Sequence, residues 1–452
     1  MVTTLLAQVS FLCKALSIHM LKNVETRQES PMAVELPESV MAWFKGKDLR
    51  LHYWVAWTVL VLGFIAYGYF EFLVPQNCDN IQCAVDYFRP DVSPKPADPF
   101  VPLYNDTRRI AVCLVGGARM FEITGRTIRK HLLDVYNNTD VFVHSPLDMD
   151  SHKLTLLAGR NLRAAKIFIP TPQAETTIVN EVITSWGSPH GLQGLLQYFN
   201  LVEGCYGMVK QYEVQYRFKY DWIIRTRVDG YWSGPVPDIA QLDPNYYYVA
   251  AGSDFHGLND RFGMGNPHTS GAANARLTLL PLMHQRGLRK LNSESAYKAQ
   301  LDISGVPYKR IQVPFCVMTL RQEAYPKPAW GLLVLSMASR GPMSGTYCRP
   351  CDKEENATVS EQVVNGCMRD WDWPGVAARE VTVCDPRKPW STEWRKIAAE
   401  SYSIDVPGEE IPSLSSRSVL QCIAEMQDFQ RQWDVWESPP IEQICAQAYR
   451  ER

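Results

Sequence analysis

The sequence lacks the signatures of several large protein classes. Lysine and arginine number 46 against 48 aspartates and glutamates, so the net charge of -2 argues against the basic surface of a nucleic-acid-binding protein. The chain contains no G-x-S-x-G and no H-E-x-x-H, the motifs of α/β hydrolases and zinc proteases. Neither the G-x-G-x-x-G nor the Walker spacing of phosphate loops occurs. The sequence therefore disfavours nucleic-acid binding and these two hydrolase classes.

One hydrophobic run is long enough to cross a membrane. Residues 51–70 carry no formal charge, and apolar residues continue to Val74. A helix of this length spans a hydrocarbon core of about 30 Å, whereas the alternative, a buried core helix, is usually shorter. Basic residues precede the run (Lys45, Lys47, Arg50) and acidic residues follow it, which places the N-terminus in the cytosol. We expect a cytosolic tail over 1–50 and a transmembrane signal anchor over 51–74, a single-pass type II topology.

The region after this span has features of the secretory pathway. Residues 75–107 contain six prolines, which suits a stiff lumenal stem. Three N-glycosylation motifs follow the span and none precedes it: Asn105-Asp-Thr107, Asn137-Asn-Thr139 and Asn356-Ala-Thr358. Eleven of the 12 cysteines follow it too, so at least one is free or pairs between chains. Cys78 and Cys83 of the stem can pair with each other or link a homodimer. The expected location is the Golgi or endoplasmic reticulum membrane, with the C-terminal domain in the lumen.

Strand-like and helix-like segments alternate from residue 108 to about 340. Apolar runs of strand length occur at 109–115, 140–144 and 165–169, and a long helical pattern at 190–217 precedes another strand at 220–228. This alternation predicts an α/β domain over 108–340 with a mainly parallel sheet covered by helices on both faces. Ligands of such sheets bind beyond the carboxyl ends of the strands.

The most informative stretch is Tyr220-Asp-Trp-Ile-Ile-Arg-Thr-Arg-Val-Asp-Gly-Tyr-Trp232. In a strand, Arg225, Arg227 and Asp229 share one face, while the apolar Trp222, Ile224 and Val228 share the other. Burying a charge without a partner is costly, so the charged row must face other residues or a ligand. It is either a structural arginine–aspartate network or an anionic-ligand and metal site at the end of the strand.

Further candidates follow the other strands. Gly116, Gly117 and Arg119 come directly after the first strand and form either a phosphate-binding loop or an ordinary turn. Asp260 lies among glycines, which allow the backbone to approach a ligand closely. Glu294 lies in the first turn of a predicted helix, where a carboxylate is favourable without any other role.

The amino-acid composition changes at about residue 341. Residues 341–452 form a cysteine- and tryptophan-rich extension whose last segment has helical spacing and is expected to pack on the α/β domain. Cys348-x-x-Cys351 with Cys367 and Cys384 can be read as a four-thiolate zinc site. The wide spacing of the second pair and an oxidising compartment favour disulfides instead.

Several stretches resemble a plant-type family of uncharacterised type II membrane proteins that share a domain of unknown function. The resemblance covers roughly residues 108–351 and is carried by 195–204, 220–232, 257–261, 291–295 and 348–351. A looser resemblance is to GT-A glycosyltransferases, whose nucleotide-sugar site follows a strand that ends in an Asp-x-Asp motif. Here that position reads Arg227-Val-Asp229, with arginine in place of the first aspartate. Some similar families keep a single aspartate, then an Asp-x-Phe-x-x-Gly motif, which Asp260, Phe262 and Gly265 match.

The second resemblance implies a lumenal glycosyltransferase that moves a sugar from a nucleotide sugar to a glycan or protein acceptor. Gly116, Gly117, Arg119, Arg225 and Arg227 would then bind the diphosphate, and Asp229 would hold Mn²⁺ or Mg²⁺. Asp260 or Glu294 would deprotonate the acceptor hydroxyl. The alternative is a non-catalytic, membrane-anchored binding or scaffold protein that has this GT-A-like fold.

Overall fold

The structure is a computed structural model that describes residues 101–185, 188, 190–322, 333–339, 341–351, 381–414 and 417–449. The predicted tail, the predicted anchor at 51–74 and most of the predicted stem lie outside these residues. Within the described ranges, no helix has both the length and the apolar character that a membrane crossing requires.

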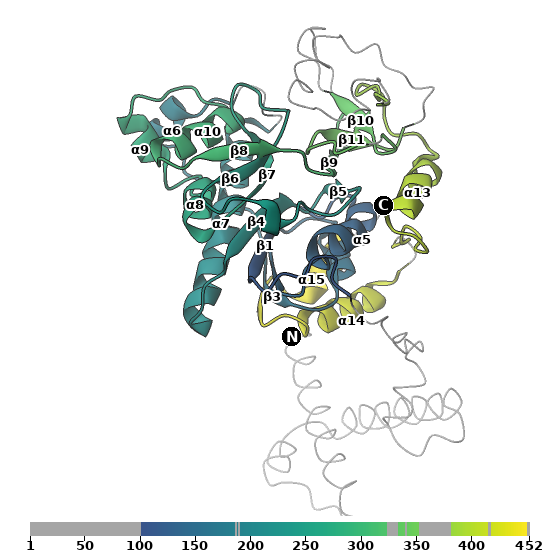
Figure 1. The fold of residues 1–452 in the computed structure, drawn as a ribbon. Coiled ribbons are helices and arrows are strands. Elements are labelled where there is room, and N and C mark those ends of the chain that lie inside the picture. The colour runs from purple at the N-terminus through teal and green to yellow at the C-terminus, as the bar shows by residue number, and fades with distance from the viewer. Residues whose placement is uncertain are drawn as a thin grey trace, which may run out of the picture. The chain divides into compact units, whose positions relative to one another are not determined.

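A sheet of eight strands forms the centre of the molecule (Figure 1). The order across it is β12-β3-β2-β1-β4-β7-β6-β8. All neighbours pair in parallel except β7, which runs antiparallel to β4 and β6. The mainly parallel sheet predicted from the sequence is therefore confirmed. The strands are β1 (Ile110–Val115), β2 (Thr139–Pro146), β3 (Leu162–Phe168), β4 (Trp222–Arg227), β6 (Tyr247–Ala250), β7 (Asn259–Gly265), β8 (Tyr308–Ile311) and β12 (Val435–Glu437).

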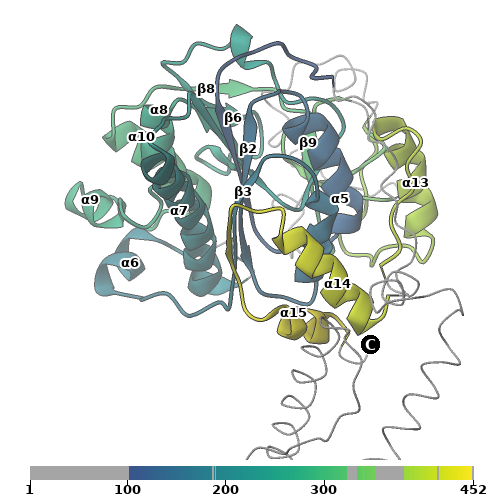
Figure 2. The same cartoon turned by 90° about the horizontal axis from the view of Figure 1, so that it is seen from below.

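Helices cover both faces of this sheet, as the near-continuous apolar strands require. The long helix α7 (Gly191–Tyr216) packs on the face that carries Ala111, Cys113 and Ile223. On the other face, α5 (Phe121–Ile128), α14 (Val419–Gln430) and α15 (Ile441–Ala448) share a core with Val112 and Ile224. Figure 2 shows α7 on one side of the strands and α5, α14 and α15 on the other.

The remaining helices extend the two sides of the molecule. A group beside β6 to β8 consists of α6 (Thr177–Val182), α8 (Pro267–Asn274), α9 (Leu280–Gln285) and α10 (Ser293–Ile303). Short turns complete the α5 side: the π-helical turn η1 (Arg129–Leu133) and the 3₁₀ turns η2 (Ser151–Leu157) and η3 (Ile239–Gln241).

A second sheet of four strands lies against α5 in the order β10-β11-β9-β5. Its strands are β5 (Gly230–Trp232), β9 (Phe315–Met318), β10 (Val334–Ser336) and β11 (Tyr347–Arg349). It therefore joins strands from both sides of the boundary predicted at residue 341.

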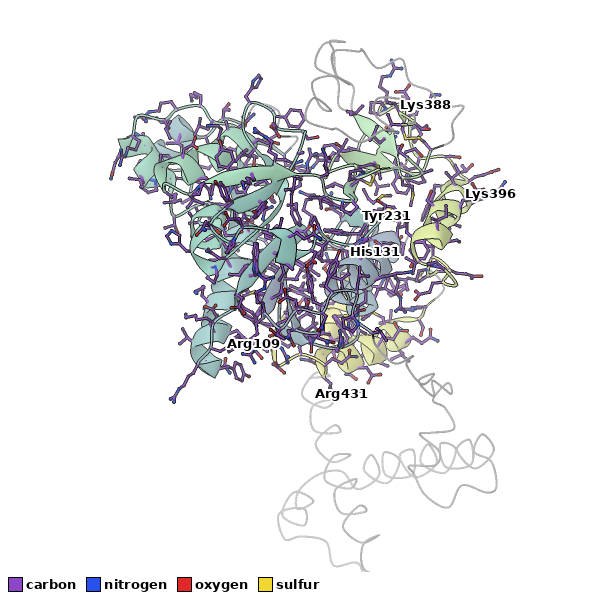
Figure 3. All side chains as sticks on the ribbon, viewed as in Figure 1. Arg109, His131, Tyr231, Lys388, Lys396 and Arg431 are labelled. Carbon is purple, nitrogen blue, oxygen red and sulfur yellow. A yellow bond between two sulfur atoms is a disulfide. The ribbon has the colours of Figure 1, made fainter. Side chains whose placement is uncertain are left out.

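Helix α13 (Trp394–Asp405) packs against this sheet and α5 through Ala398 and Tyr402, and its last residue adds two polar contacts. The Asp405 carbonyl oxygen lies 2.8 Å from Nε2 of His131, and its carboxylate accepts a hydrogen bond from the Tyr231 hydroxyl. Figure 3 labels Tyr231 and His131, the two residues that contact Asp405.

Four disulfides staple the described chain: Cys113–Cys205, Cys316–Cys348, Cys351–Cys384 and Cys422–Cys445. Cys348 and Cys351 thus have different partners, which excludes the four-thiolate zinc site. Cys367, the remaining member of that proposed set, lies outside the described residues. The disulfides favoured from the sequence are confirmed for these eight cysteines.

Candidate functional site

The strand order of the large sheet reverses direction between β1 and β4. The chain moves from β1 to β2 and β3 in one direction and then returns to add β4 on the opposite side of β1. Ligands of open α/β sheets bind at such a reversal, beyond the carboxyl ends of the strands. In register, Val115 at the end of β1 faces Arg227 at the end of β4. The candidate residues after these two strands are therefore neighbours in space.

The loop after β1 needs its two glycines for different reasons. Gly116 has φ 114°, a conformation that residues with a Cβ rarely adopt. A Cβ on Gly117 would lie 2.3 Å from Oδ2 of Asp148, so a larger residue there would displace that carboxylate. Arg119 follows with an exposed side chain. The loop thus brings its backbone and the exposed guanidinium of Arg119 to the end of β1.

Asp229 is not an open carboxylate. Its side chain is buried, and both of its oxygens accept hydrogen bonds from Arg227, at 2.8 Å from Nε and 2.6 Å from Nη2. Burial favours the neutral acid, but the Arg227 guanidinium, helped by the charge of Arg119, holds the pKa of Asp229 below its usual range. The side chain of Arg227 remains 23% exposed, so the cation and not the acid presents surface at this position.

This pairing bears on the predicted metal. A divalent ion takes several oxygen ligands, and Arg227 already occupies both oxygens of Asp229. Across the ranges that the structure describes, no group of three or more His, Cys, Asp or Glu side chains is placed to hold a metal ion. The donors around Asp229 therefore do not fit Mn²⁺ or Mg²⁺, and the metal role of Asp229 stays a prediction of the sequence.

Arg225 lies two residues before Arg227 in β4 and is completely buried. Its Nη1 donates to the Tyr198 hydroxyl at 3.2 Å and to the carbonyl oxygen of Asp260, and its Nη2 donates to the Tyr297 hydroxyl at 2.9 Å. Its Nε has no hydrogen-bond partner in the part of the chain that the structure describes. Among the described residues, no carboxylate forms an ion pair with Arg225, so a full positive charge is held by neutral acceptors.

Asp260 is the second residue of the antiparallel strand β7, at the edge where β4 ends. Its carboxylate accepts a hydrogen bond from the Ser293 hydroxyl and lies 3.6 Å from Nη2 of Arg276. Arg276 is itself buried, stacked 4.2 Å from the ring of Phe199, with Nε and Nη1 unpartnered. The Arg276 guanidinium is therefore a second buried cation, and it lies next to the Asp260 carboxylate.

Glu294 lies one residue beyond Ser293, in the first turn of α10. Burial, reinforced by the neighbouring Asp260 charge, raises the pKa of Glu294 to about 8. The side chain nevertheless retains accessible surface. A Cβ on Gly257 would lie 2.0 Å from the carbonyl oxygen of Glu294, so this glycine is what lets the preceding loop pack against the start of α10.

The predicted residues form one connected region, linked by aromatic side chains that the sequence did not single out. Tyr198 of α7 donates to the Asp260 carbonyl oxygen at 2.5 Å, and the Arg227 guanidinium lies 5.9 Å from its ring. Arg261 lies 4.1 Å from the ring of Tyr347. Arg276 was also missed, although it is the only charged residue between Thr269 and Met283. A single charged residue within such an uncharged segment was the signal from which Arg276 could have been predicted.

The region carries an excess of positive charge. Four guanidinium groups, those of Arg225, Arg227, Arg261 and Arg276, share it with the carboxylates of Asp229 and Asp260. The raised pKa of Glu294 keeps this third acid largely uncharged at neutral pH. Because burying unpaired charge is unfavourable, this excess of positive charge would suit an anionic ligand.

Comparison with solved structures gives matches of low similarity. The glycosyltransferase GlyE of Streptococcus pneumoniae TIGR4 matches with 13% identity and a TM-score of 0.24, and its apo form with 11% and 0.25. Each match covers 46% of this chain and 46% of the other, so it spans less than half of that protein. At these values neither match bears on the function of this chain.

Comparison by sequence gives a clearer result. No curated protein matches significantly. Residues 105–451 match a family described as "Domain of unknown function (DUF7796)", which spans every strand and helix described above. The chain therefore belongs to the DUF7796 family of proteins with a domain of unknown function.

Proposed function

We propose that this protein is a glycosyltransferase that moves a sugar from a nucleotide sugar to a glycan or protein acceptor. The observation that carries the proposal is the arginine cluster beside the reversal point between β1 and β4, whose four guanidinium groups outnumber its two charged carboxylates. A diphosphate supplies the missing negative charge, and guanidinium groups bind phosphate oxygens in pairs. The arginines also stabilise the charge that develops on the leaving nucleoside diphosphate.

The two acids beside this cluster suit the second half of the reaction. In glycosyl transfer the acceptor hydroxyl attacks the anomeric carbon while the bond to the diphosphate breaks, and a base takes the hydroxyl proton. Glu294 retains accessible surface, and its pKa of about 8 is matched to proton transfer near neutral pH. Asp260, held on Ser293 and close to Arg276, stays in place as the neighbouring negative charge.

The cellular setting is part of the proposal. The apolar run at 51–74, the glycosylation motifs beyond it and the four disulfides support a Golgi or endoplasmic reticulum protein with a lumenal domain. Dimerisation through Cys78 or Cys83 remains a prediction, as does a requirement for Mn²⁺ or Mg²⁺.

A non-catalytic sugar-binding or scaffold protein is the second candidate. It is favoured by the closed pair between Arg227 and Asp229, which resembles a structural ion pair. A cavity of about 950 Å³ lies beside η1 and is lined by residues such as Arg126, His131 and Glu409, but by none of the predicted site residues. A protein that binds nucleotide sugars yet neither hydrolyses nor transfers any of them would support this candidate.

The decisive test is a calorimetric titration of the purified protein with a panel of nucleotide sugars, with and without Mn²⁺. Arg227→Met should weaken binding about 10–100-fold, the value of one lost charge-assisted contact. Arg387→Met is the matched control, because Arg387 makes the same two-pronged pair with Asp385 at 2.9 and 2.8 Å on the exposed surface. Equal affinities for both variants would reject the diphosphate site.

A further inference from the structure

Two of the glycosylation motifs, far apart in the sequence, are neighbours in the fold. Tyr104 and Tyr136 form a parallel β-bridge, and each is followed directly by the asparagine of a motif, Asn105 and Asn137. The side-chain amide of Asn138 donates to the carbonyl oxygen of Thr107 at 3.0 Å, which joins the middle of one motif to the end of the other. Both acceptor asparagines are exposed.

The two motifs differ in how tightly the fold holds them. In the motif at Asn105, Thr107 is exposed as well. In the motif at Asn137, the Asn138 carbonyl oxygen accepts from the Ile110 amide at 3.0 Å, so the backbone is part of the pairing between β1 and β2. Thr139 is 1% exposed, and its hydroxyl has no hydrogen-bond partner.

The third residue of the motif matters because the modifying enzyme recognises its hydroxyl, which is why only serine or threonine serves there. In the folded chain the Thr107 hydroxyl can be reached and the Thr139 hydroxyl cannot. Releasing Thr139 would require the start of β2 to separate from the start of β1, where Thr139 pairs with Ile110.

We propose that Asn105 and Asn137 both carry N-linked glycans and that Asn137 is modified only before β2 pairs with β1. The donor is an oligosaccharide carried on a lipid diphosphate. The asparagine amide nitrogen forms a bond to the anomeric carbon, the bond from that carbon to the diphosphate breaks, and the lipid diphosphate leaves together with the amide proton. The proposal rests on the lumenal placement given above.

The two glycans would share one corner of the molecule. Ile110 and Thr139 open β1 and β2, so this corner is at the amino edge of the parallel strands. The arginine cluster lies beyond the carboxyl edge of β1 and β4. The glycans therefore shield the edge opposite the candidate site and leave that site open to its substrates.

The first experiment counts glycans on the full chain translated with endoplasmic-reticulum microsomes, in an Asn356→Gln background that removes the third motif. Thr107→Val and Thr139→Val should each remove one endoglycosidase-sensitive mobility step. Thr139→Ser, which keeps the hydroxyl, should retain both. Protease protection of the C-terminal domain in the same microsomes reports on translocation.

The outcomes separate the two proposals. A protected chain without glycans at these asparagines would overturn the present proposal alone, whereas an unprotected chain would overturn the lumenal placement and this proposal with it. Neither result touches nucleotide-sugar binding, which is measured on the purified protein.

The second experiment tests the order of events. Folded, unglycosylated chain is given to solubilised oligosaccharyltransferase with its lipid-linked donor, and glycopeptides are identified by mass spectrometry. Asn105 should be modified and Asn137 should not, while prior unfolding in urea, followed by dilution into the assay, should raise modification of Asn137 at least tenfold. Equal modification of both asparagines in the folded chain would overturn the proposed order.

Discussion

Two clusters of buried charge lie beyond the same edge of the large sheet and are built in opposite ways. Beyond β1 and β2, the ammonium group of Lys153 lies 2.8 Å from Glu122 and 2.8 Å from Asp150, so one cation meets two anions. Beyond β4 and β7, Arg225 is held by two tyrosine hydroxyls and a carbonyl oxygen, and Arg276 leaves two nitrogens unpartnered.

Under the proposed function, the first cluster is structural and the second serves ligand binding. A buried ion pair whose partners are all present in the chain is complete without a ligand, and removing one member leaves the others exposed to the full cost of burial. A buried cation with neutral acceptors already bears part of that cost in the free protein. Such an arrangement persists where a ligand supplies the counter-charge, so the two clusters should respond differently to the same kind of substitution.

The largest effect should come from breaking the complete cluster. Lys153→Met leaves the buried Glu122 carboxylate without its cation and should lower the free energy of unfolding by about 3–5 kcal/mol. Urea unfolding measures it. Lys166→Met is the control, because the pair between Lys166 and Glu437 is at the surface, with side chains 35% and 65% exposed, and should cost less than about 1 kcal/mol. Similar losses in both variants would contradict a structural role for the buried pair.

Substitution in the incomplete cluster should instead affect binding. Arg225→Met removes a buried charge that has no carboxylate partner, but it also removes the hydrogen bonds to the Tyr198 and Tyr297 hydroxyls and the Asp260 carbonyl oxygen. The free energy of unfolding should therefore fall by about 1–3 kcal/mol, less than in Lys153→Met. Nucleotide-sugar affinity should fall about 10–100-fold, because the counter-charge for the diphosphate is reduced. A loss of stability as large as that of Lys153→Met, with unchanged affinity, would show that Arg225 is structural.

The sequence predicted the parts of this contrast that depend on local pattern. The alternation of apolar and charged residues in β4 placed Arg225 and Arg227 on one face, and the structure puts Trp222, Ile224 and Val228 in the core on the other. The parallel sheet followed from the alternation of elements, and the strand order then brought the end of β1 beside the end of β4.

What the sequence did not reveal depends on contacts between distant segments. No spacing rule links Arg276 to Asp260, or Tyr198 on α7 to the carbonyl oxygen of Asp260. The closed pair between Arg227 and Asp229 was one of two alternatives, and only side-chain geometry decides between them. Likewise, Cys113 and Cys205 pair across the interface between β1 and α7, which cysteine counting does not indicate.

A smaller effect is expected from Glu294, the acid beside the incomplete cluster. Its pKa in the folded protein, about 8, lies above the value of about 4.3 in an unfolded chain. Its contribution to stability is therefore fully present below about pH 4.3 and is lost as the pH rises through 8. Glu294→Gln carries no titrating group, so the stability of the original protein relative to this variant should fall by about 1–2 kcal/mol across that range, allowing for partial exposure. A difference that is flat with pH would place Glu294 in ordinary solvent.

The smallest effect is expected from Thr139, at the opposite edge of the sheet. The buried hydroxyl of Thr139 has no hydrogen-bond partner, so it is a neutral counterpart of the unpartnered arginine nitrogens. If incomplete burial is a cost in the free protein, Thr139→Val should raise the free energy of unfolding by up to about 1 kcal/mol, since valine keeps the shape and removes the unsatisfied polar group. The measurement is urea unfolding of the unglycosylated chain, with Thr107→Val as the exposed control that should change little. A loss of stability in Thr139→Val would mean that this hydroxyl has a hydrogen-bond partner in solution. The nitrogens of Arg225 and Arg276 would then be expected to have partners in solution as well.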